Sequence, residues 1–299
     1  MKFSIIINVL NGENYLEETI ASVLSQTYQN FELIIIDNAS IDRTHEISKS
    51  FSDDRIRYKR LQSTRPLGKS RNIGLGMTTG DAISFLDADD LYCVNRLEVY
   101  ADQFIKNNEI DILYSNSQII GKRSQHKRYL YQRMMPSGNL TKELIERYFI
   151  SLETVCFRKS ALGYTKFNDE FGFIEEADFF IRLSENRLIK YVNSPLAKWR
   201  EHTDSLTSLY PENFYFEAQR WSKYLFEKHN EFYMKYKKSI TKFIVTQNIF
   251  KTKMNYLKGS GPKMSWVHSL LQRSSVKDYI QIMLIISLPK LMLKKIYLK

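Results

Sequence analysis

AISFLDADD, residues 82–90, is a short apolar run followed at once by three carboxylates. A run of this kind predicts a buried strand at residues 82–86, and Asp87, Asp89 and Asp90 then follow its C-terminal end. Open α/β sheets bind their ligands at the C-terminal ends of parallel strands. Asp-x-Asp triplets also serve as turn and helix-capping residues, so this stretch alone leaves a ligand site and a structural cap both open.

The rest of the first half repeats the pattern of short apolar runs separated by segments with helical spacing. Leu16, Ile20 and Leu24 fall on one helix face, as do Leu97 and Ala101 later in the chain. Strands are predicted at residues 3–7, 32–36, 56–60, 82–86 and, more weakly, 111–115. This alternation indicates an α/β fold with a mainly parallel central sheet flanked by helices.

A second acid, Asp37, directly follows the second predicted strand. Two neighbouring strands would then direct acids into one crevice, which suits a nucleotide. Carboxylates there can hold Mg²⁺ or Mn²⁺, which favour oxygen ligands, against the diphosphate of a nucleotide. The metal then neutralises the negative charge of the diphosphate as this group leaves. The alternative is that Asp37 only starts a turn, because Asp-Asn-Ala-Ser is turn-like.

Composition narrows the class of protein. The chain has 299 residues, enough for one large domain or for a domain with an extension. Its only cysteines, Cys93 and Cys156, lie far apart, so we expect neither a disulfide framework nor a structural zinc site, and a reducing cytoplasm fits best. The N-terminal MKFSIII reaches polar Asn8 too soon for a secretory signal and is interpreted as a strand.

The net charge of +11 comes entirely from the end of the chain. Residues 1–211 carry 27 Lys and Arg against 28 Asp and Glu, and residues 212–299 carry 17 against 5. Residues 212–256 are predicted to be helical and aromatic, and a Gly-Ser-Gly-Pro break follows at 259–262. The apolar run at 279–288 is shorter than the roughly twenty residues that span a bilayer. Its lysine-rich surroundings predict a helix lying on an anionic membrane surface, and a buried amphipathic helix is the alternative.

Several blocks, in order, resemble glycosyltransferase family 2, inverting enzymes with the nucleotide-diphospho-sugar transferase fold called GT-A. The resemblance covers roughly residues 3–208, and its blocks are residues 4–16, 22–28, 31–44, 68–74 and 87–89. It implies that Asp37 binds the base, with Arg71 in the same nucleotide site. It further implies that Asp87 and Asp89 contact the ribose, the diphosphate and a metal.

Two later segments resemble the catalytic end of the same family. Residues 173–183, FIEEADFFIRL, look like its Glu-Asp block, whose second acid is the catalytic base; that position is Glu176 here, with Glu175 and Asp178 as rivals. A base is required because single-displacement inversion deprotonates the acceptor hydroxyl as it attacks. Residues 199–207 resemble the closing Arg-x-x-His segment, which makes His202 a candidate metal ligand beside Asp89.

The chain departs from the family pattern at two places. Asn8-Val9-Leu10 replaces the common Pro-Thr-Tyr, so an aromatic contact to the base from that strand is absent. Asn38 stands where a second Asp is frequent. The polar, basic residues 122–139 are interpreted as a mobile loop or a segment beside the acceptor, with an ordinary solvated loop as the alternative.

These observations predict a GT-A catalytic domain at residues 1–211 and a helical, basic extension at 212–299. The expected function is transfer of a hexose, glucose or galactose, from a UDP-sugar with Mn²⁺ or Mg²⁺. The expected acceptor is a polyprenyl-diphosphate-linked saccharide in O-antigen or capsule assembly, at the cytoplasmic face of a bacterial inner membrane. A protein or glycolipid acceptor, or a catalytically silent relative that only binds nucleotide-sugars, stays open.

Two other classes of function fit the sequence poorly. A nucleic-acid-binding protein would explain the basic aromatic tail, but acids at two strand ends would repel a polyanion. A dinucleotide-dependent oxidoreductase needs G-x-G-x-x-G directly after the first strand, whereas Gly74-Leu75-Gly76 follows the third.

Overall fold

The structure is a computed structural model that describes residues 1–121, 127–202 and 211–258. The chain forms two compact units. The first comprises Met1–Leu144 and Tyr148–Ser205, and the second comprises Ile145–Arg147 and Leu206–Lys299. The expected amphipathic segment at 279–299 lies outside the described residues.

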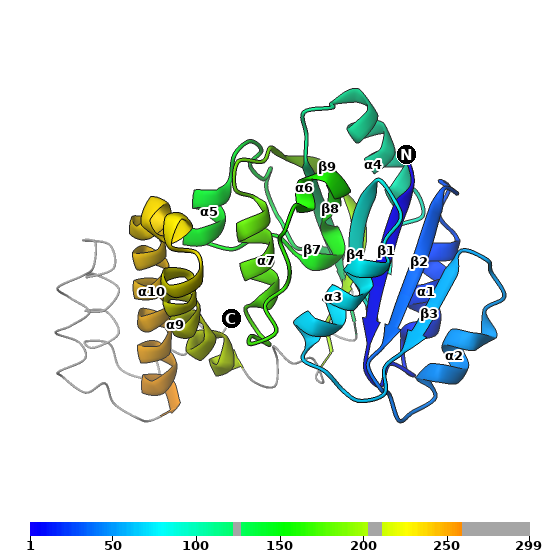
Figure 1. Ribbon diagram of the computed structural model, residues 1–299, viewed down its shortest axis with the longest axis horizontal. Coiled ribbons are helices and arrows are strands. Elements are labelled where there is room, and N and C mark those ends of the chain that lie inside the picture. Colours follow the sequence, from blue (N-terminus) through cyan, green and yellow to red (C-terminus); the bar gives the residue numbers. More distant parts are fainter. Residues whose placement is uncertain (122–126, 203–210, 259–299) are drawn as a thin grey trace. The chain divides into compact units, whose positions relative to one another are not determined.

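The first unit is built on a nine-stranded sheet of order β3-β2-β1-β4-β8-β6-β9-β5, with β7 paired to β6 (Figure 1). The strands are β1 (Phe3–Val9), β2 (Phe31–Asp37), β3 (Ile56–Arg60), β4 (Ala82–Asp87), β5 (Leu91–Tyr92), β6 (Ile112–Ile120), β7 (Arg128–Tyr129), β8 (Cys156–Arg158) and β9 (Ile189–Arg200). The helices up to β9 are α1 (Leu16–Leu24), α2 (Thr44–Ser50), α3 (Leu67–Met77), α4 (Arg96–Lys106), α5 (Thr141–Glu146), the 3₁₀ helix η1 (Leu152–Thr154), α6 (Lys159–Leu162) and α7 (Glu175–Leu183).

The predicted strands and helices of the first half are confirmed. All five predicted strands are present as β1, β2, β3, β4 and β6, and the two apolar helix faces belong to α1 and α4. The pairs β1–β2, β1–β4, β2–β3 and β6–β9 are parallel, while β8 pairs antiparallel with both β4 and β6. The sheet is therefore mixed, with a parallel half that carries the predicted acids.

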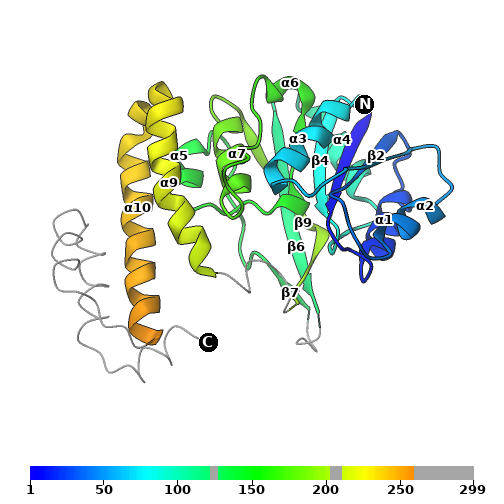
Figure 2. The ribbon, with the colours of Figure 1, turned by 60° about the horizontal axis from the view of Figure 1, so that its bottom comes forward.

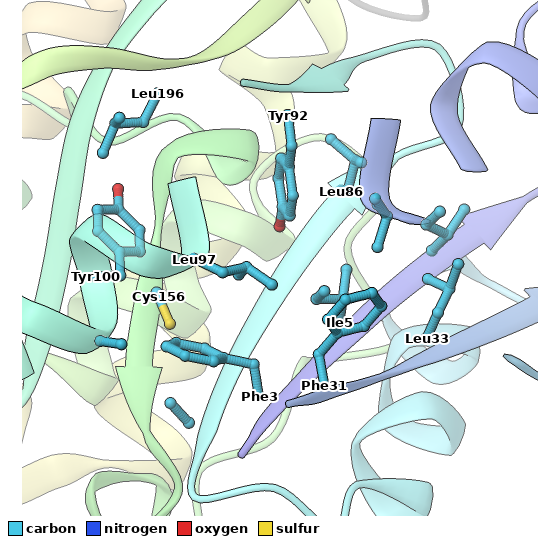
Figure 3. Packing of buried hydrophobic residues seen from close by; sticks show 14 of the residues in the cluster. Phe3, Ile5, Phe31, Leu33, Leu86, Tyr92, Leu97, Tyr100, Cys156 and Leu196 are labelled. Carbon is cyan, nitrogen blue, oxygen red and sulfur yellow. The ribbon is translucent and has the colours of Figure 1, made fainter. Parts of the chain in front are cut away.

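The central strands are continuous apolar runs because both faces of the sheet are covered. Alternate residues of β1 and β2 pack with α1 and α4 in one buried cluster, and Ile6 on the opposite face lies under Gly74 of α3. Figure 3 shows members of that cluster, among them Phe3, Ile5, Phe31, Leu33, Leu86, Tyr92, Leu97, Tyr100, Cys156 and Leu196. Burial on both faces fixes the strands, and with them the positions of the acids at their ends.

The second unit contains the helices α9 (Pro211–Lys228) and α10 (Asn230–Lys258), which run beside each other as a hairpin (Figure 2). Trp221 of α9 is fully buried, and its ring meets Phe243 of α10 edge to face at 5.5 Å between centroids. Tyr215 donates a hydrogen bond to Asn248 Oδ1 at 2.9 Å. The prediction of aromatic helices after residue 211 is thus confirmed for the described part of this region.

The segment interpreted from the sequence as a loop at 122–139 contains a short strand in its described part, residues 127–139. Arg128–Tyr129 form β7, and the side chain of Asn116 on β6 binds both backbone groups of Tyr131. This asparagine holds the chain where the short strand ends. No helix in residues 1–121, 127–202 or 211–258 is both long and apolar enough to cross a membrane.

Two glycines near the start of β4 give a matched stability test. A Cβ on Gly80 would lie 2.7 Å from Lys2 O and 2.8 Å from Ser4 N, both backbone atoms that cannot move aside. A Cβ on Gly76, in α3, would meet nothing within 4 Å. We expect Gly80→Ala to lower the free energy of unfolding by about 3 kcal/mol and Gly76→Ala to raise it by about 0.5 kcal/mol. Urea unfolding measures both, and equal effects would contradict this packing.

Candidate active site

The predicted acids lie at one edge of the sheet. In the parallel register Val9 of β1 pairs with Asp37 of β2, and Asn8 pairs with Asp87 of β4. Asp37 and Asp87 therefore end strands on either side of β1, at the C-terminal edge where open α/β sheets bind ligands.

Asp37 is fully buried, and both of its carboxylate oxygens are engaged within the protein. Oδ1 accepts a hydrogen bond from the Ser40 backbone N–H at 2.8 Å, and Oδ2 accepts one from the Tyr58 hydroxyl at 2.6 Å. The Arg60 guanidinium lies 3.6 Å from Oδ2. Burial and the Asp37 carboxylate raise the pKa of Tyr58, so Tyr58 stays protonated as the donor. Asp37 thus holds the loop after β2, the turn role left open by the sequence, and base recognition at Asp37 stays a prediction.

The same loop carries a strained residue. Ala39 has φ of 64°, a left-handed conformation that costs a residue with a Cβ about 1–2 kcal/mol. We expect Ala39→Gly to raise the free energy of unfolding by about 0.5 kcal/mol, after the larger entropy of glycine in the unfolded chain is subtracted. The control is Ala218→Gly in α9, which should lower it by about 1 kcal/mol or more. Thermal unfolding measures both variants, and a loss of stability in Ala39→Gly would contradict the strain.

Arg71 of α3 connects two parts of the predicted site. Its guanidinium is 3% exposed; Nη2 donates to Asp87 Oδ1 at 3.0 Å and Nη1 donates to Glu175 Oε1 at 2.8 Å. Burial disfavours its charge, but the carboxylates of Asp87, Glu175 and Glu176 outweigh that cost and raise the pKa of Arg71. One buried cation therefore brings the end of β4 together with the start of α7.

The three acids of α7 differ in what they contact. Glu175 is bound by Arg71, and Asp178 is bound by Arg182 one turn further along the helix, at 3.0 Å from Nε to Oδ1. Glu176 is half-buried and accepts a hydrogen bond from the neutral Tyr148 hydroxyl at 2.9 Å. Among the residues that the structure describes, no arginine binds the Glu176 carboxylate directly, whereas arginines bind both rivals, so Glu176 is the acid best placed to act as a base.

Burial shifts the pKa of Glu176 into the range of a base at neutral pH. Loss of solvent raises it, the charges of Asp87 and Glu175 raise it further, and Arg71 and the Tyr148 hydrogen bond oppose the rise. The net result is a pKa of about 8. Burial and the charge of Asp89 also raise the pKa of Asp87, against the pull of Arg71.

Asp89 and His202, the two predicted metal ligands, contact each other. His202 Nε2 lies 2.8 Å from Asp89 Oδ2, and the His202 ring lies against Tyr15 at 5.4 Å between centroids. Arg200, at the end of β9, fixes this arrangement. Its Nε donates to the Asp89 carbonyl at 2.9 Å, and its backbone N–H donates to Asp90 Oδ1 at 2.8 Å.

Asp89 and His202 could provide some, but not all, of the ligands of the expected Mn²⁺ or Mg²⁺. Within the described residues, no group of three or more His, Cys, Asp or Glu side chains is placed to hold a metal. Asp89 and His202 offer a carboxylate oxygen and an imidazole nitrogen, a donor set that Mn²⁺ accepts. Small divalent cations keep positions for water and phosphate oxygens, so two side chains and a diphosphate suffice.

Two buried acids beside the site were not assigned any role from the sequence. Asp90 is 3% exposed; burial raises its pKa well above the usual range, with added repulsion from Glu153, Asp89 and Asp87. Glu153 of η1 is 2% exposed, and its pKa is raised by burial. Glu153 lies far from the β4 acids in sequence, so no local pattern reveals their proximity.

Comparisons with known proteins identify the family. The profile of the family described as "Glycosyl transferase family 2" matches residues 4–164. An uncharacterized glycosyltransferase of Rickettsia bellii is 29% identical over 214 residues, which are 71% of this chain and 31% of that protein. The Escherichia coli UDP-Glc:alpha-D-GlcNAc-diphosphoundecaprenol beta-1,3-glucosyltransferase WfgD is 32% identical over 181 residues, 60% of this chain and 68% of WfgD. This chain thus spans about a third of the Rickettsia protein and two thirds of WfgD.

Solved structures agree on the fold. S. aureus TarS residues 1–349, in complex with UDP-GlcNAc, matches with a TM-score of 0.69 at 19% identity, over 95% of this chain and 85% of that chain. The mixed sheet and this match show that the first unit has the GT-A fold. The chain belongs to glycosyl transferase family 2, whose profile covers more than half of its length.

Proposed function

We propose that this protein is an inverting glycosyltransferase that transfers glucose from UDP-glucose to a polyprenyl-diphosphate-linked saccharide. The observation that carries the proposal is the Arg71 bridge. It joins Asp87, expected at the nucleotide, to the acids of α7, where Glu176 accepts a hydrogen bond from Tyr148 and has a pKa of about 8.

The reaction is a single displacement. Glu176 accepts the proton of an acceptor hydroxyl as that oxygen bonds to the anomeric carbon of the sugar, and the bond from this carbon to the diphosphate oxygen breaks. UDP leaves with the electron pair of the broken bond. Attack opposite the leaving group turns an α-linked donor into a β-linked product.

The other residues of the site have separate roles in binding the donor. Asp37 and Arg71 shape the nucleotide site, Asp37 by holding the loop after β2 and Arg71 by holding Asp87, and Asp87 contacts the ribose and diphosphate. Asp89 and His202 would hold Mn²⁺ or Mg²⁺, which supplies Lewis-acid neutralisation of the diphosphate. Arg200 positions both neighbouring acids: its guanidinium donates to the backbone carbonyl of Asp89, and its backbone N–H donates to the side chain of Asp90.

The choice of glucose and of a lipid-linked acceptor is supported by WfgD, whose name gives a UDP-glucose donor and a diphosphoundecaprenol-linked acceptor. A lipid-linked acceptor lies at a membrane, and the lysine-rich end of this chain has the charge to bind an anionic leaflet. We place the enzyme at the cytoplasmic face of a bacterial inner membrane, in the assembly of O-antigen or capsule saccharides.

Release of UDP tests the donor and the metal together. Purified protein is incubated with UDP-glucose, UDP-galactose and UDP-GlcNAc, with Mn²⁺, Mg²⁺ or chelator, and with membrane lipid extract as acceptor. We expect metal-dependent release with UDP-glucose, lost in Asp89→Ala and retained in the surface variant Glu143→Ala. If folded protein released no UDP from any donor, the protein would be a relative without catalytic activity. If it released UDP from a different sugar, only the assignment of glucose as the donor sugar would be wrong.

A truncation tests the membrane surface. Protein lacking residues 260–299 should no longer sediment with vesicles of anionic phospholipid and should turn over a lipid-linked acceptor more slowly. Unchanged sedimentation and unchanged turnover would contradict the role of this segment.

A further inference from the structure

Tyr148 follows α5 closely in the chain and lies outside every block of the family resemblance. Its hydroxyl donates to Glu176 Oε1 at 2.9 Å. We propose that Tyr148 is a positioning residue that holds the Glu176 carboxylate by Oε1, so that Oε2 receives the proton of the acceptor. The inference rests on the proposed function, because it requires Glu176 to be the base.

The geometry shows why a positioning group is needed at this place. Arg71 attracts Glu176 and already binds Glu175 and Asp87 with its two Nη atoms. A carboxylate that turned to the guanidinium would lose basicity in a charge-assisted pair. A neutral phenol orients the carboxylate at a smaller cost in basicity. Within the described residues, no hydrogen bond or ion pair engages Oε2.

Tyr148 has the protonation state that this role needs. Burial raises its pKa well above the usual range, and the charge and hydrogen bond of Glu176 raise it further. The phenol therefore keeps its proton throughout the reaction and remains a donor. The proton that moves is the one that passes from the acceptor hydroxyl to Glu176.

Several charged or titratable groups face the Glu176 carboxylate. They are Arg71 from α3, Asp87 from β4, Glu175 from α7, and the phenols of Tyr148 and Tyr131. The hydrogen bond from Tyr148 favours the charged form of Glu176 and so lowers its pKa against the effect of burial. Removal of this one hydroxyl should therefore raise the pKa of Glu176.

Tyr148→Phe removes the hydroxyl and keeps the ring. The control is Tyr164→Phe, because Tyr164 is fully exposed. We expect Tyr148→Phe to lower kcat about tenfold, since a hydrogen bond to a charged group is lost. The KM for UDP-glucose should stay unchanged, and the ascending limb of the pH profile should move to higher pH. A wild-type kcat, or a lower kcat whose pH profile has not moved, would overturn the proposal.

A second measurement does not depend on turnover. Protein labelled with ¹³C at glutamate carboxyls is titrated by NMR, and Glu176→Gln assigns the resonance. We expect Glu176 to titrate at higher pH in Tyr148→Phe than in the wild type. An active enzyme whose Glu176 titration does not move would overturn the role of Tyr148 alone. A titration that moves in a protein without turnover would contradict the proposed function and, with it, the positioning of a base.

Discussion

Glu176→Gln is expected to lower kcat by about 10²–10⁴-fold, because the amide cannot accept the proton of the acceptor hydroxyl. Glutamine has nearly the same shape and can still accept the Tyr148 hydrogen bond, so the fold and the KM for the donor should be preserved. Steady-state UDP release gives both constants. The surface variant Glu143→Gln is the matched control and should behave like the wild type.

The rival acids make this test specific. Glu175→Gln removes a partner of buried Arg71, and Asp178→Asn removes a partner of Arg182, so both should lower stability more than they lower kcat of the folded fraction. If Asp178→Asn or Glu175→Gln lost activity as Glu176→Gln is expected to, while Glu176→Gln stayed active, the base would be misassigned.

The pH dependence of the wild type follows from the same residue. A base works when deprotonated, and the pKa of Glu176 is raised to about 8. The value of kcat/KM should therefore fall about tenfold for each pH unit below this pKa and level off above it. An ascending limb centred near pH 4.5 would contradict the burial of this carboxylate.

Arg71→Ala is expected to lower the stability of the fold strongly. It removes the buried cation that binds both Asp87 and Glu175, and loss of one member of a buried ion pair costs about 3–5 kcal/mol in the free energy of unfolding. Arg43→Ala is the control, because Arg43 and Glu46 form an ion pair whose side chains are 74% and 71% exposed. That surface pair should contribute about 0.5 kcal/mol or less. Urea unfolding measures both variants.

A double variant separates the lost charge from the lost packing. Arg71→Ala with Glu175→Gln removes a buried carboxylate charge together with the guanidinium and should recover part of the stability that Arg71→Ala loses. If Arg71→Ala cost no more than Arg43→Ala, the bridge between β4 and α7 would not hold the site together.

The sequence predicted the parallel strands β1 to β4 well, because each of them has a local sequence pattern. β1, β2 and β4 are buried on both faces and read as unbroken apolar runs, and α1 has a regular apolar face. In the other half, where parallel and antiparallel pairs mix, only β6 was predicted and β5, β7, β8 and β9 were missed. β9 contains Pro195 and alternates irregularly, because the β6–β9 register shifts beside Asn116, and β5, β7 and β8 are only two or three residues long.

The sequence proposed the residues of the candidate site but not most of the contacts among them. The Asp89–His202 pair was anticipated from the family resemblance, and the structure places their side chains 2.8 Å apart. The ion pair of Arg71 with Glu175 joins residues 104 positions apart, and Tyr148 reaches Glu176 from a segment without any motif. Such partners depend on how α5, α7 and the sheet pack, which no local pattern encodes.

The stereochemistry of the product tests the central claim most directly. The enzyme is incubated with UDP-glucose labelled with ¹³C at the anomeric carbon and with a polyprenyl-diphosphate-linked saccharide, and the coupling constants of the isolated lipid product are measured by NMR. Single displacement with Glu176 as base predicts a β-linked glucoside, and its formation at a rate about 10²–10⁴-fold lower in Glu176→Gln. An α-linked glucoside, or an equal yield from Glu176→Gln, would contradict the account.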